Sequence, residues 1–594
     1  MKKLRLVIAL MLSVFLLAAC ATDPTPETPP PADPEPVEAV EEDPEEVEEV
    51  EEAEEVEEVE EVEAEEVLDN VDLTPGVFPV IRDPSQAPRM RVAKQVSPLL
   101  IREIDEIPMI AEIAEETGVF FDWEAVPAAG ATERVNLMIA GGDLPDAFWH
   151  LISEEMIAQF MGQNVFLPTQ DLIDTYMPHL QRVFNEAPQY RAMATAPDGN
   201  MYGFPYIEEM FGLVLTPGPF LINQVWLDEA GLDMPATIDE WADALRAFRD
   251  MGRTPFAFNL GARDAFGSFD TFFQFTGAFG QAIPVDGTRP ESFLTVQNDE
   301  VVFVGNHIAM RDTANWFHEL HMEGLICIDS FSPFPGDWGA FYLERIRAEG
   351  AVIGSFGVWA PVGDIPVFEE RIQYVPIPRM TGPAGRTGFA NNFSEMQRAS
   401  AFTITTAAQY PEILARYSDY LYIPDVSFRQ NWGAIGYTFE RNEDGTLRSR
   451  LDETGSPIMV PPFETVGEMA QNSRGEKGAI AILNSYYDVY GPYAWDALDL
   501  LAFQRINGKE EILAEMTSVP RMIMTVEEAR VVAQIQPIIL SLVNEFRMSA
   551  ILDGTGNANW DQFNEDLIAA GLDQMLDAYN SAYARFLDMM AQFE

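Results

Sequence analysis

The sequence predicts an α/β protein in which parallel sheets are covered by helices on both faces. Strand-like and helix-like segments alternate after residue 88, which favours βαβ units over an all-β or all-α fold. With 594 residues the chain is too long for one ordinary domain, so we expect three or four domains or two large lobes. Apolar residues make up 47% of the chain, which is enough for a sizeable core in each lobe.

The first twenty residues are typical of a lipoprotein signal peptide. Three basic residues precede an apolar run that is too short to span a bilayer comfortably. The run ends in Leu-Ala-Ala-Cys, which resembles the lipobox of bacterial lipoproteins. This resemblance implies that residues 1–20 are a signal peptide and that Cys20 carries the lipid, which would be the only membrane anchor. An ordinary secretory signal with an incidental cysteine is the alternative.

Residues 21–87 are predicted to form a disordered tether. The segment starts rich in proline, and residues 41–66 approximate a Glu-Glu-Val repeat. A period of three does not keep one face of a helix apolar, and glutamates three and four residues apart repel each other. We therefore expect an extended spacer, with a cation-binding acidic tail as the alternative.

The charge balance excludes two classes of partner. The chain has 36 Lys and Arg against 97 Asp and Glu, a formal net charge of −61. A phosphate backbone or an anionic membrane surface needs a basic face, so we expect no nucleic-acid partner and no electrostatic membrane binding. Lysine is unusually scarce: beyond residue 20 it occurs only as Lys94, Lys477 and Lys509.

The body begins with five elements that can be placed from the residues alone. Glycines directly after the helical patterns supply their stops, at Gly118 and at Gly141-Gly142. Open sheets built from such units place ligands beyond the carboxyl ends of their strands. The predicted elements are a strand at Met90–Val96, a helix at Pro108–Thr117, a strand at Val119–Val126, a helix at Thr132–Ala140 and a strand at Pro145–Trp149.

Five stretches carry a resemblance to a known family. Residues 137–146, LMIAGGDLPD, resemble a segment of the extracellular solute-binding proteins of ABC transporters, in particular the lipoproteins that take up oligosaccharides. The resemblance covers residues from about 88 to the end. The other four stretches follow in the family's order: DGNMYGFP at 198–205, WLDEAGL and PATIDEW within 226–241, LHMEGLI at 320–326, and the segment 556–587.

The resemblance implies a bilobed periplasmic-binding-protein-like fold of type II, with two α/β lobes joined by crossover hinge segments. It places lobe one at 88–215 plus 372–425 and lobe two at 216–371 plus 426–594. It also implies that the chain is a monomer that binds a carbohydrate between its lobes and delivers it to the permease subunits of an ABC transporter. The family members are binding proteins, so the resemblance implies no enzyme activity and no cofactor.

The same motifs have a plain structural interpretation. Asp198-Gly199 is a turn pair, and Thr237 with Glu240 forms a capping box at the start of a helix. Gly324 is expected to end a further helix. These residues specify the scaffold, so the function must be tested at the residues between the lobes.

A carbohydrate site needs aromatic faces for C–H groups and polar side chains for hydroxyls. We looked for such residues at predicted strand ends and in glycine-rich loops. For each aromatic residue, packing in the core is the alternative, and Trp226, Trp241, Trp316 and Trp560 are assigned to packing because they lie on helical patterns. The candidate ligand-binding residues are Trp149, His150, Trp338, Trp359, Asn391, Arg398, Trp432 and Tyr437.

Other chemistry is disfavoured by the spacing of the residues. His318 and His321 are three apart, but the pattern is not His-Glu-x-x-His, so we predict no metal site. Residues 442–445, Asn-Glu-Asp-Gly, fit a hairpin turn better than a calcium loop. A secreted polysaccharide hydrolase stays open as an alternative function because paired carboxylates cannot be located among so many acids. A peptide-binding transport receptor is the other alternative.

Overall fold

A computed structural model describes most of the chain from residue 70 onward, and lobe one is built on a six-stranded sheet. The described residues are 70–209, 219–258, 270–284, 293–331, 353–358, 365, 368–387, 394–490 and 519–593. Across the sheet the strands are β14 (Ala481–Ile482), β4 (Phe204–Glu208), β11 (Met396–Ile404), β3 (Ala147–Trp149), β1 (Arg91–Val96) and β2 (Asp122–Pro127).

The strands of this sheet run in one direction except for β11. Strand β1 is parallel to β2 and β3, and β14 is parallel to β4. Strand β11 is antiparallel to β3 and β4, between which it lies. The carboxyl ends of β1, β2, β3 and β4 therefore share one edge of the sheet with the amino end of β11.

The helices of lobe one begin and end where local signals place them. Helix α3 stops at Gly118, which has a φ of 71° and lies so close to Ile81 that a Cβ would be 2.1 Å from its carbonyl oxygen. The first five predicted elements are confirmed, with β2 starting at Asp122 rather than Val119. The helices are α3 (Pro108–Thr117), α4 (Ala131–Gly141), α5 (Glu154–Phe160), α6 (Gln170–Tyr176), α7 (Pro178–Glu186), α8 (Pro188–Ala194), α16 (Pro411–Leu421), α17 (Pro424–Trp432), α18 (Val466–Gln471) and α19 (Asn484–Tyr490).

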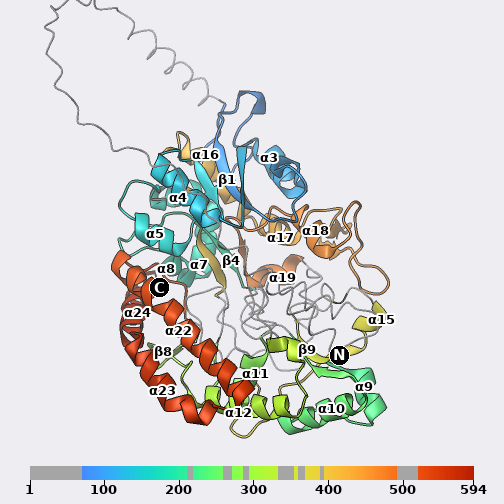
Figure 1. Cartoon of the computed structure of the whole chain (residues 1–594). Helices are drawn as coiled ribbons and strands as arrows, with labels where there is room; N and C mark the ends of the chain where they lie inside the picture. Colours follow the sequence, from blue (N-terminus) through green and yellow to red (C-terminus); the bar gives the residue numbers. More distant parts are fainter. Residues whose placement is uncertain are drawn as a thin grey trace, which may run out of the picture. The chain divides into compact units, whose positions relative to one another are not determined.

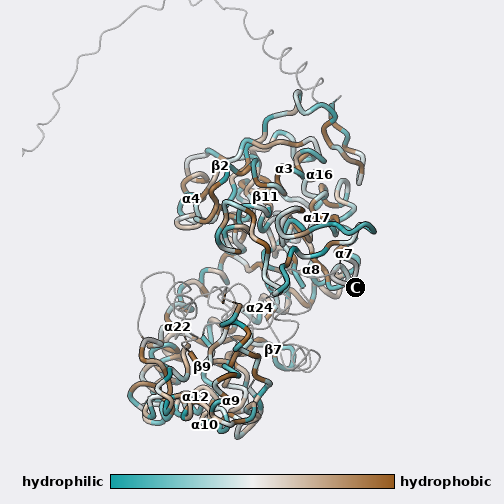
Figure 2. The backbone as a smooth tube through the Cα atoms, turned by 90° about the vertical axis from the view of Figure 1, so that its right-hand side faces the viewer, coloured by the Kyte–Doolittle hydropathy of each residue, from teal (hydrophilic) through white to brown (hydrophobic). Residues whose placement is uncertain are grey.

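Lobe two is built on a second, mixed sheet of four strands. Strand β5 (Phe220–Asn223) is antiparallel to β10 (Tyr374–Pro376) and β9 (Ile353–Gly357), and β9 is parallel to β6 (Thr254–Phe256). Its core is aromatic and centres on the fully buried Trp241. Apolar segments alternate with polar ones along the chain in both lobes (Figure 2).

The helices of lobe two include three long ones at the end of the chain, α22, α23 and α24, which pack against one another (red in Figure 1). Helix α10 starts with the predicted capping box of Thr237 and Glu240, and α12 is followed by Gly324 with a φ of 71°. The helices are α9 (Gln224–Ala230), α10 (Ile238–Asp250), α11 (Phe272–Thr276), α12 (Ile308–Met322), α15 (Phe368–Arg371), α22 (Val526–Asp553), α23 (Gly556–Ala569) and α24 (Leu572–Phe593).

Two hairpins complete the described strands. Strands β12 (Phe439–Arg441) and β13 (Leu447–Ser449) pair across the turn that the sequence predicted at residues 442–445. Strands β7 (Leu294–Gln297) and β8 (Glu300–Phe303) form the other hairpin. Both are antiparallel ribbons outside the two main sheets.

Three boundaries differ from those expected from the sequence. Residues 70–87 were predicted to be the end of the disordered tether, but Val80 and Ile81 are buried in the core of the first sheet, so this segment belongs to lobe one. Strand β10 pairs with β5 of the second sheet, so residues 374–376 belong to lobe two rather than to lobe one. Residues from Val426 to Tyr486 contribute to the core of the first sheet, and β14 pairs with β4, so this segment belongs to lobe one. The chain therefore crosses between the sheets later than predicted, because long connections of similar composition give no local signal of which sheet they join.

Helix α22 has the length and composition of a membrane span, although the sequence patterns indicated no such segment after the signal peptide. It is 28 residues long and mostly apolar. In the structure it packs against α12, α23 and α24, and Val543, Ala550 and Ile551 are fully buried among them. This burial is what a core helix of a lobe requires.

Candidate functional site

Charged and polar side chains gather at the edge of the first sheet where β1, β2, β3 and β4 end. Open α/β sheets bind ligands at edges of this kind. Segments far apart in the chain supply the residues, including α5, α17, the turn at 474–478 and the segment before α22. We call these residues the edge cluster: Lys94, His150, Glu154, Tyr206, Glu208, Arg398, Asn431, Arg474, Glu476, Lys477 and Arg521.

Trp149 lies beneath the edge cluster and has no exposed surface. Its Nε1 donates to the carbonyl oxygen of Lys477 at 2.5 Å, and the Lys94 ammonium lies 4.9 Å from the ring centroid. A Cβ at Gly478 would lie 2.7 Å from the indole ring, so only glycine fits there. In this structure the Trp149 indole supports the turn that carries Lys477, and its predicted contact with a ligand stays a prediction.

Three residues of the edge cluster hold a backbone conformation that non-glycine residues rarely adopt. His150, Glu476 and Lys477 have φ values of 57°, 46° and 50°. Left-handed backbone at such residues costs on the order of 1–3 kcal/mol each and persists only where the surroundings impose it. Such strain concentrates at functional sites, which supports the edge cluster as the candidate site.

His150 is buried with one ring nitrogen unused. Its exposed fraction is 9%, and its Nδ1 has no hydrogen-bond partner among the described residues. Burial holds the pKa of His150 well below its usual value, and the nearby Arg398 lowers it further. The imidazole is therefore neutral at physiological pH and offers one donor and one acceptor.

Glu208 belongs to a buried hydrogen-bonded group with Tyr206 and Asn431. The Tyr206 hydroxyl lies 2.6 Å from Glu208 Oε2 and 2.9 Å from Asn431 Oδ1, and Asn431 Nδ2 donates to Glu208 Oε1 at 2.8 Å. Burial raises the pKa of Glu208, against the effect of these hydrogen bonds. The group is an array of donors and acceptors of the kind that recognises hydroxyl groups.

Arg398 and Glu154 connect the strand ends to the segment before α22. The Arg398 guanidinium donates to the carbonyl oxygen of Ile152 at 3.0 Å. Glu154 accepts from the Ala399 amide and from Arg521, both at 2.7 Å. Burial alone would raise the pKa of Glu154, but the charges of Arg521 and Arg398 outweigh it and lower the pKa to about 2.

The remaining charges lie around the strained turn. Arg474 and Lys477 lie 3.5 Å and 3.9 Å from Glu476. Lys94 is 4% exposed and its Nζ donates to the carbonyl oxygen of Glu476 at 3.2 Å. Burial lowers the pKa of Lys94 to about 7. Together with Arg398, these residues make the edge cluster rich in cations.

Two further predicted residues lie in lobe one, and Trp432 directly follows Asn431 of the edge cluster, with its Nε1 buried and without a partner among the described residues. Trp432 is the last residue of α17 and is 7% exposed. Tyr437 accepts a hydrogen bond from Arg102 at 3.0 Å, and the guanidinium lies 5.3 Å from its ring centroid. The structure thus brings His150 and Arg398 together, with Trp149 beneath them. Trp338, Trp359, Asn391 and the lipidation residue Cys20 lie outside the described residues.

Sequence reasoning missed most of the edge cluster. Lys94 lies in a strand and Lys477 in a turn, and neither matches a motif. One signal could have found them: only three lysines occur beyond residue 20, and two of those three meet here. The missed residues are Lys94, Glu154, Tyr206, Glu208, Asn431, Arg474, Glu476, Lys477 and Arg521.

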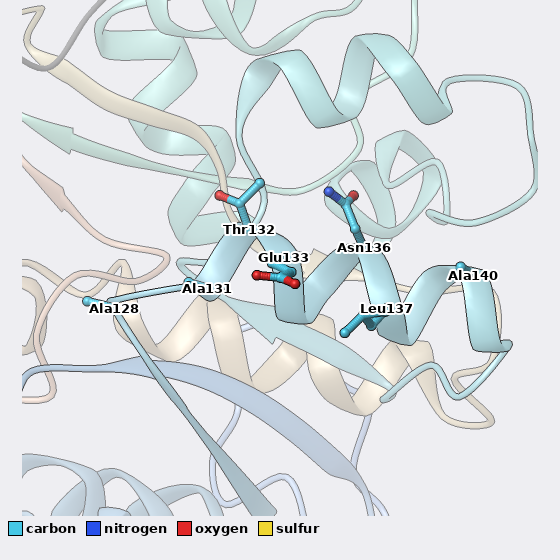
Figure 3. A pocket seen from close by; sticks show the side chains of 8 residues that line it. Ala128, Ala131, Thr132, Glu133, Asn136, Leu137 and Ala140 are labelled. Atoms are coloured by element: carbon cyan, nitrogen blue, oxygen red, sulfur yellow. The ribbon is translucent and has the colours of Figure 1, made fainter. Parts of the chain in front are cut away.

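A surface hollow of about 690 Å³ lies over α4, which begins just after β2 ends. Figure 3 shows Thr132 and Asn136 on one side of the helix and Leu137 on another. Leu137, from the LMIAGGDLPD motif, is 61% exposed. Glu133 is the one ionisable residue among those that line the hollow, so it offers less binding chemistry than the edge cluster.

The candidate metal ligands have structural partners. His318 Nδ1 donates to the carbonyl oxygen of Ile551 at 2.7 Å, which ties α12 to α22. In the turn at 442–446, Asp444 accepts from both the amide and the hydroxyl of Thr446. Within the described ranges no group of three or more His, Cys, Asp or Glu is arranged to hold a metal ion.

The fold is that of the type II solute-binding proteins, with two α/β lobes. Residues 106–302 match the family model "Bacterial extracellular solute-binding protein". The resemblance to the solute-binding proteins of ABC transporters that the motifs indicated is thus confirmed.

Among characterised proteins, the chain is similar to the fructooligosaccharide ABC transporter substrate-binding protein FusA of Streptococcus pneumoniae serotype 4. The two are 28% identical over 510 residues, which cover 82% of this chain and 89% of FusA. The structure of FusA in complex with kestose matches with a TM-score of 0.69 and 26% identity, over 84% of this chain and all of the other.

A solute-binding protein from Bifidobacterium longum infantis, named for binding HMO and for its association with an ABC transporter, shares the fold. It matches with a TM-score of 0.70 over 84% of this chain and 99% of the other, at 17% identity. The relatives named here are binding proteins of ABC transporters rather than enzymes.

Proposed function

We propose that this chain is a lipid-anchored extracellular receptor that binds an oligosaccharide between its two lobes and delivers it to an ABC permease. The edge cluster would form the lobe-one side of the binding site. One observation carries the proposal: a partly unsatisfied polar cluster at the ligand-binding edge of a fold that is similar, over 84% of the chain, to FusA in complex with kestose.

The chemistry of the edge cluster suits a sugar. Glu208, Tyr206 and Asn431 form a fixed set of donors and acceptors, and His150 keeps one ring nitrogen free of partners in the described structure. Buried polar groups without partners cost free energy, which a ligand hydroxyl can recover by hydrogen bonding. Closure of two lobes around a ligand is the usual motion of such folds.

The direct test is binding without turnover. The purified chain is incubated with a panel of neutral and acidic oligosaccharides and one oligopeptide, and thermal unfolding and reducing ends are followed together. We expect at least one oligosaccharide to raise the unfolding temperature while the reducing ends stay constant. Release of reducing ends would support the hydrolase alternative, and a shift with the peptide alone would support a peptide receptor.

The proposed anchor is tested separately with Cys20→Ser. Without a thiol for lipidation, the variant should move from the membrane fraction to the medium or to the soluble fraction. Retention of the variant in the membrane fraction at the level of the natural chain would count against lipid as the anchor. The binding assay should be unaffected, because residue 20 precedes both lobes.

A further inference from the structure

The edge cluster has the opposite charge to the rest of the chain. The whole sequence has 97 acidic against 36 basic residues, yet four cations lower the pKa of His150: Arg398, Lys477, Lys94 and Arg521. Two of these four are lysines, from a chain with only three lysines beyond residue 20. Cations are thus concentrated at the very edge where the fold binds its ligand.

The carboxylates of the cluster neutralise only part of this charge. Glu154 is engaged by Arg521 through an ion pair of 2.7 Å. Glu476 is the carboxylate near both Arg474 and Lys477. Among the described residues the cluster therefore holds five cationic side chains, Lys94, Arg398, Arg474, Lys477 and Arg521, against three carboxyl groups, those of Glu154, Glu208 and Glu476.

The third carboxyl group lies where burial disfavours its negative charge. Glu208 is 7% exposed, and burial favours its protonated form. The Tyr206 hydroxyl has acceptors on two sides, Glu208 Oε2 and Asn431 Oδ1, and a proton on Glu208 would satisfy both contacts. Because the pKa of Lys94 is lowered to about 7, its own positive charge is also partial at neutral pH, and with both effects included the cluster keeps a net positive charge.

The buried nitrogens of the cluster that have no hydrogen-bond partner within the described ranges include one on Arg474, its Nε, and two that face the proposed ligand chemistry more directly. These two are His150 Nδ1 and Arg398 Nε, and the Arg398 contacts that the structure gives are to backbone carbonyl groups. Arginine binds oxyanions with its Nε and Nη atoms together, and here the Nε is unused. The strained turn holds Lys477, whose side chain is 46% exposed, at the open side of the cluster.

We infer that the edge cluster binds an oxyanion substituent of the oligosaccharide, through Arg398, Lys477 and His150. A carboxylate of a uronic acid fits this chemistry, and a sulfate or phosphate ester on the sugar offers the same oxygens. A neutral sugar would leave the buried positive charge uncompensated, which costs free energy on desolvation. This inference rests on the proposed function and narrows its substrate class.

The test compares three probes of matched length by calorimetry: trigalacturonate, its fully methyl-esterified form and a sulfated trisaccharide. We expect trigalacturonate to bind at least tenfold more tightly than the neutral ester, with the advantage shrinking between 0.05 M and 0.5 M NaCl as charges are screened. Lys477→Gln should reduce the affinity for the acid severalfold and leave that for the ester unchanged. Arg89→Gln, at a side chain that is 85% exposed, is the matched control and should change neither.

The outcomes separate the two proposals. A preference for the sulfated probe over trigalacturonate supports the oxyanion site and indicates that the bound oxyanion is a sulfate or phosphate ester rather than a carboxylate. Equal or tighter binding of the methyl ester overturns the oxyanion inference and leaves the proposed function standing. If none of the probes and no neutral oligosaccharide binds, the proposed function fails and the inference fails with it.

Discussion

The two lobes bury different kinds of side chain beside their sheets. In lobe two, Trp241 lies 4.9 Å from both Phe256 and Phe275, ring centroid to ring centroid, and its Nε1 donates to Ser355. In lobe one, Trp149 is just as buried, but an ammonium group and a strained turn are packed against it. The same residue type thus serves an apolar core in one lobe and a charged edge in the other.

This difference indicates which part of the molecule is less stable than an apolar core would be. Aromatic packing adds stability through burial and favourable ring geometry. Buried charges lose hydration, and replacing them with apolar groups is often neutral or stabilising. Each lobe buries a structural ion pair, Arg416 with Asp419 in lobe one and Arg547 with Asp270 in lobe two. Lobe one has further buried charges at the candidate ligand-binding edge, where we assign them a function, and the comparison can be tested by disturbing each lobe in turn.

The largest expected effect is in the aromatic core of lobe two. Trp241→Ala should lower the free energy of unfolding by about 4 kcal/mol, because the cavity cannot collapse among packed rings. Urea unfolding followed by fluorescence measures the change. Trp560→Ala, at a partly buried indole on α23, is the control and should cost clearly less. Equal losses from the two variants would contradict a core centred on Trp241.

The buried ion pair of Glu154 and Arg521 in the edge cluster comes next. Glu154→Ala leaves Arg521 without this carboxylate and should cost about 3 kcal/mol at pH 7, measured by urea unfolding. Glu155→Ala changes an exposed neighbour on the same helix and should cost little. Because the pKa of Glu154 is lowered from 4.5 to about 2, its contribution is complete above pH 4.5 and is lost as the pH falls toward 2. If the difference in free energy of unfolding between the natural chain and the variant does not change with pH over that range, this assignment is contradicted.

Because of Lys94, the free energy of unfolding of lobe one should increase as the pH rises above 7. The pKa of Lys94 is about 7 in the folded chain, against an ordinary value of 10.5. Between pH 7 and pH 10.5 the lysine is therefore protonated in the unfolded chain but mostly neutral in the folded one. Stability therefore rises with pH, by about 2–3 kcal/mol between pH 7 and pH 9. Thermal or urea unfolding at the two pH values should show this gain in the natural chain and not in Lys94→Met. The same gain in both would assign it to other groups.

The smallest expected effect compares one helix cap from each lobe. Thr237 caps α10 of lobe two and Thr465 caps α18 of lobe one, each in a complete capping box. Replacing either by alanine should cost about 1 kcal/mol, because one backbone amide loses its partner. Urea unfolding of both variants gives the comparison. Neither change should alter ligand affinity, since both threonines lie outside the edge cluster.

Local signals made much of the scaffold predictable from sequence. The capping box at Thr237 and the stop at Gly118 depend on residues three or four positions apart, so the sequence contains the whole interaction. The hairpin at 442–445 follows the same rule. The assignment of Trp226 and Trp241 to packing is confirmed by their burial in the core of lobe two.

The candidate site could not be predicted in the same way because its contacts join distant segments. Lys94 and Glu476 are separated by 382 positions, and Trp149 is covered by the turn at Lys477, 328 positions away. A tryptophan at a strand end was predicted to face a ligand because nothing nearby in the sequence covers it. The turn that does cover it has no motif, since its shape is imposed by the indole beneath it.

The placement of Lys477 has a practical consequence. It is one of three lysines beyond residue 20, and the half-exposed ammonium stands at the rim of the edge cluster. Amine-selective dyes have few places to attach in a protein with so little lysine. Reductive alkylation of Lys477 with an environment-sensitive fluorophore would keep the positive charge to which we assign a role in binding, and the dye would report changes in solvation at the candidate site.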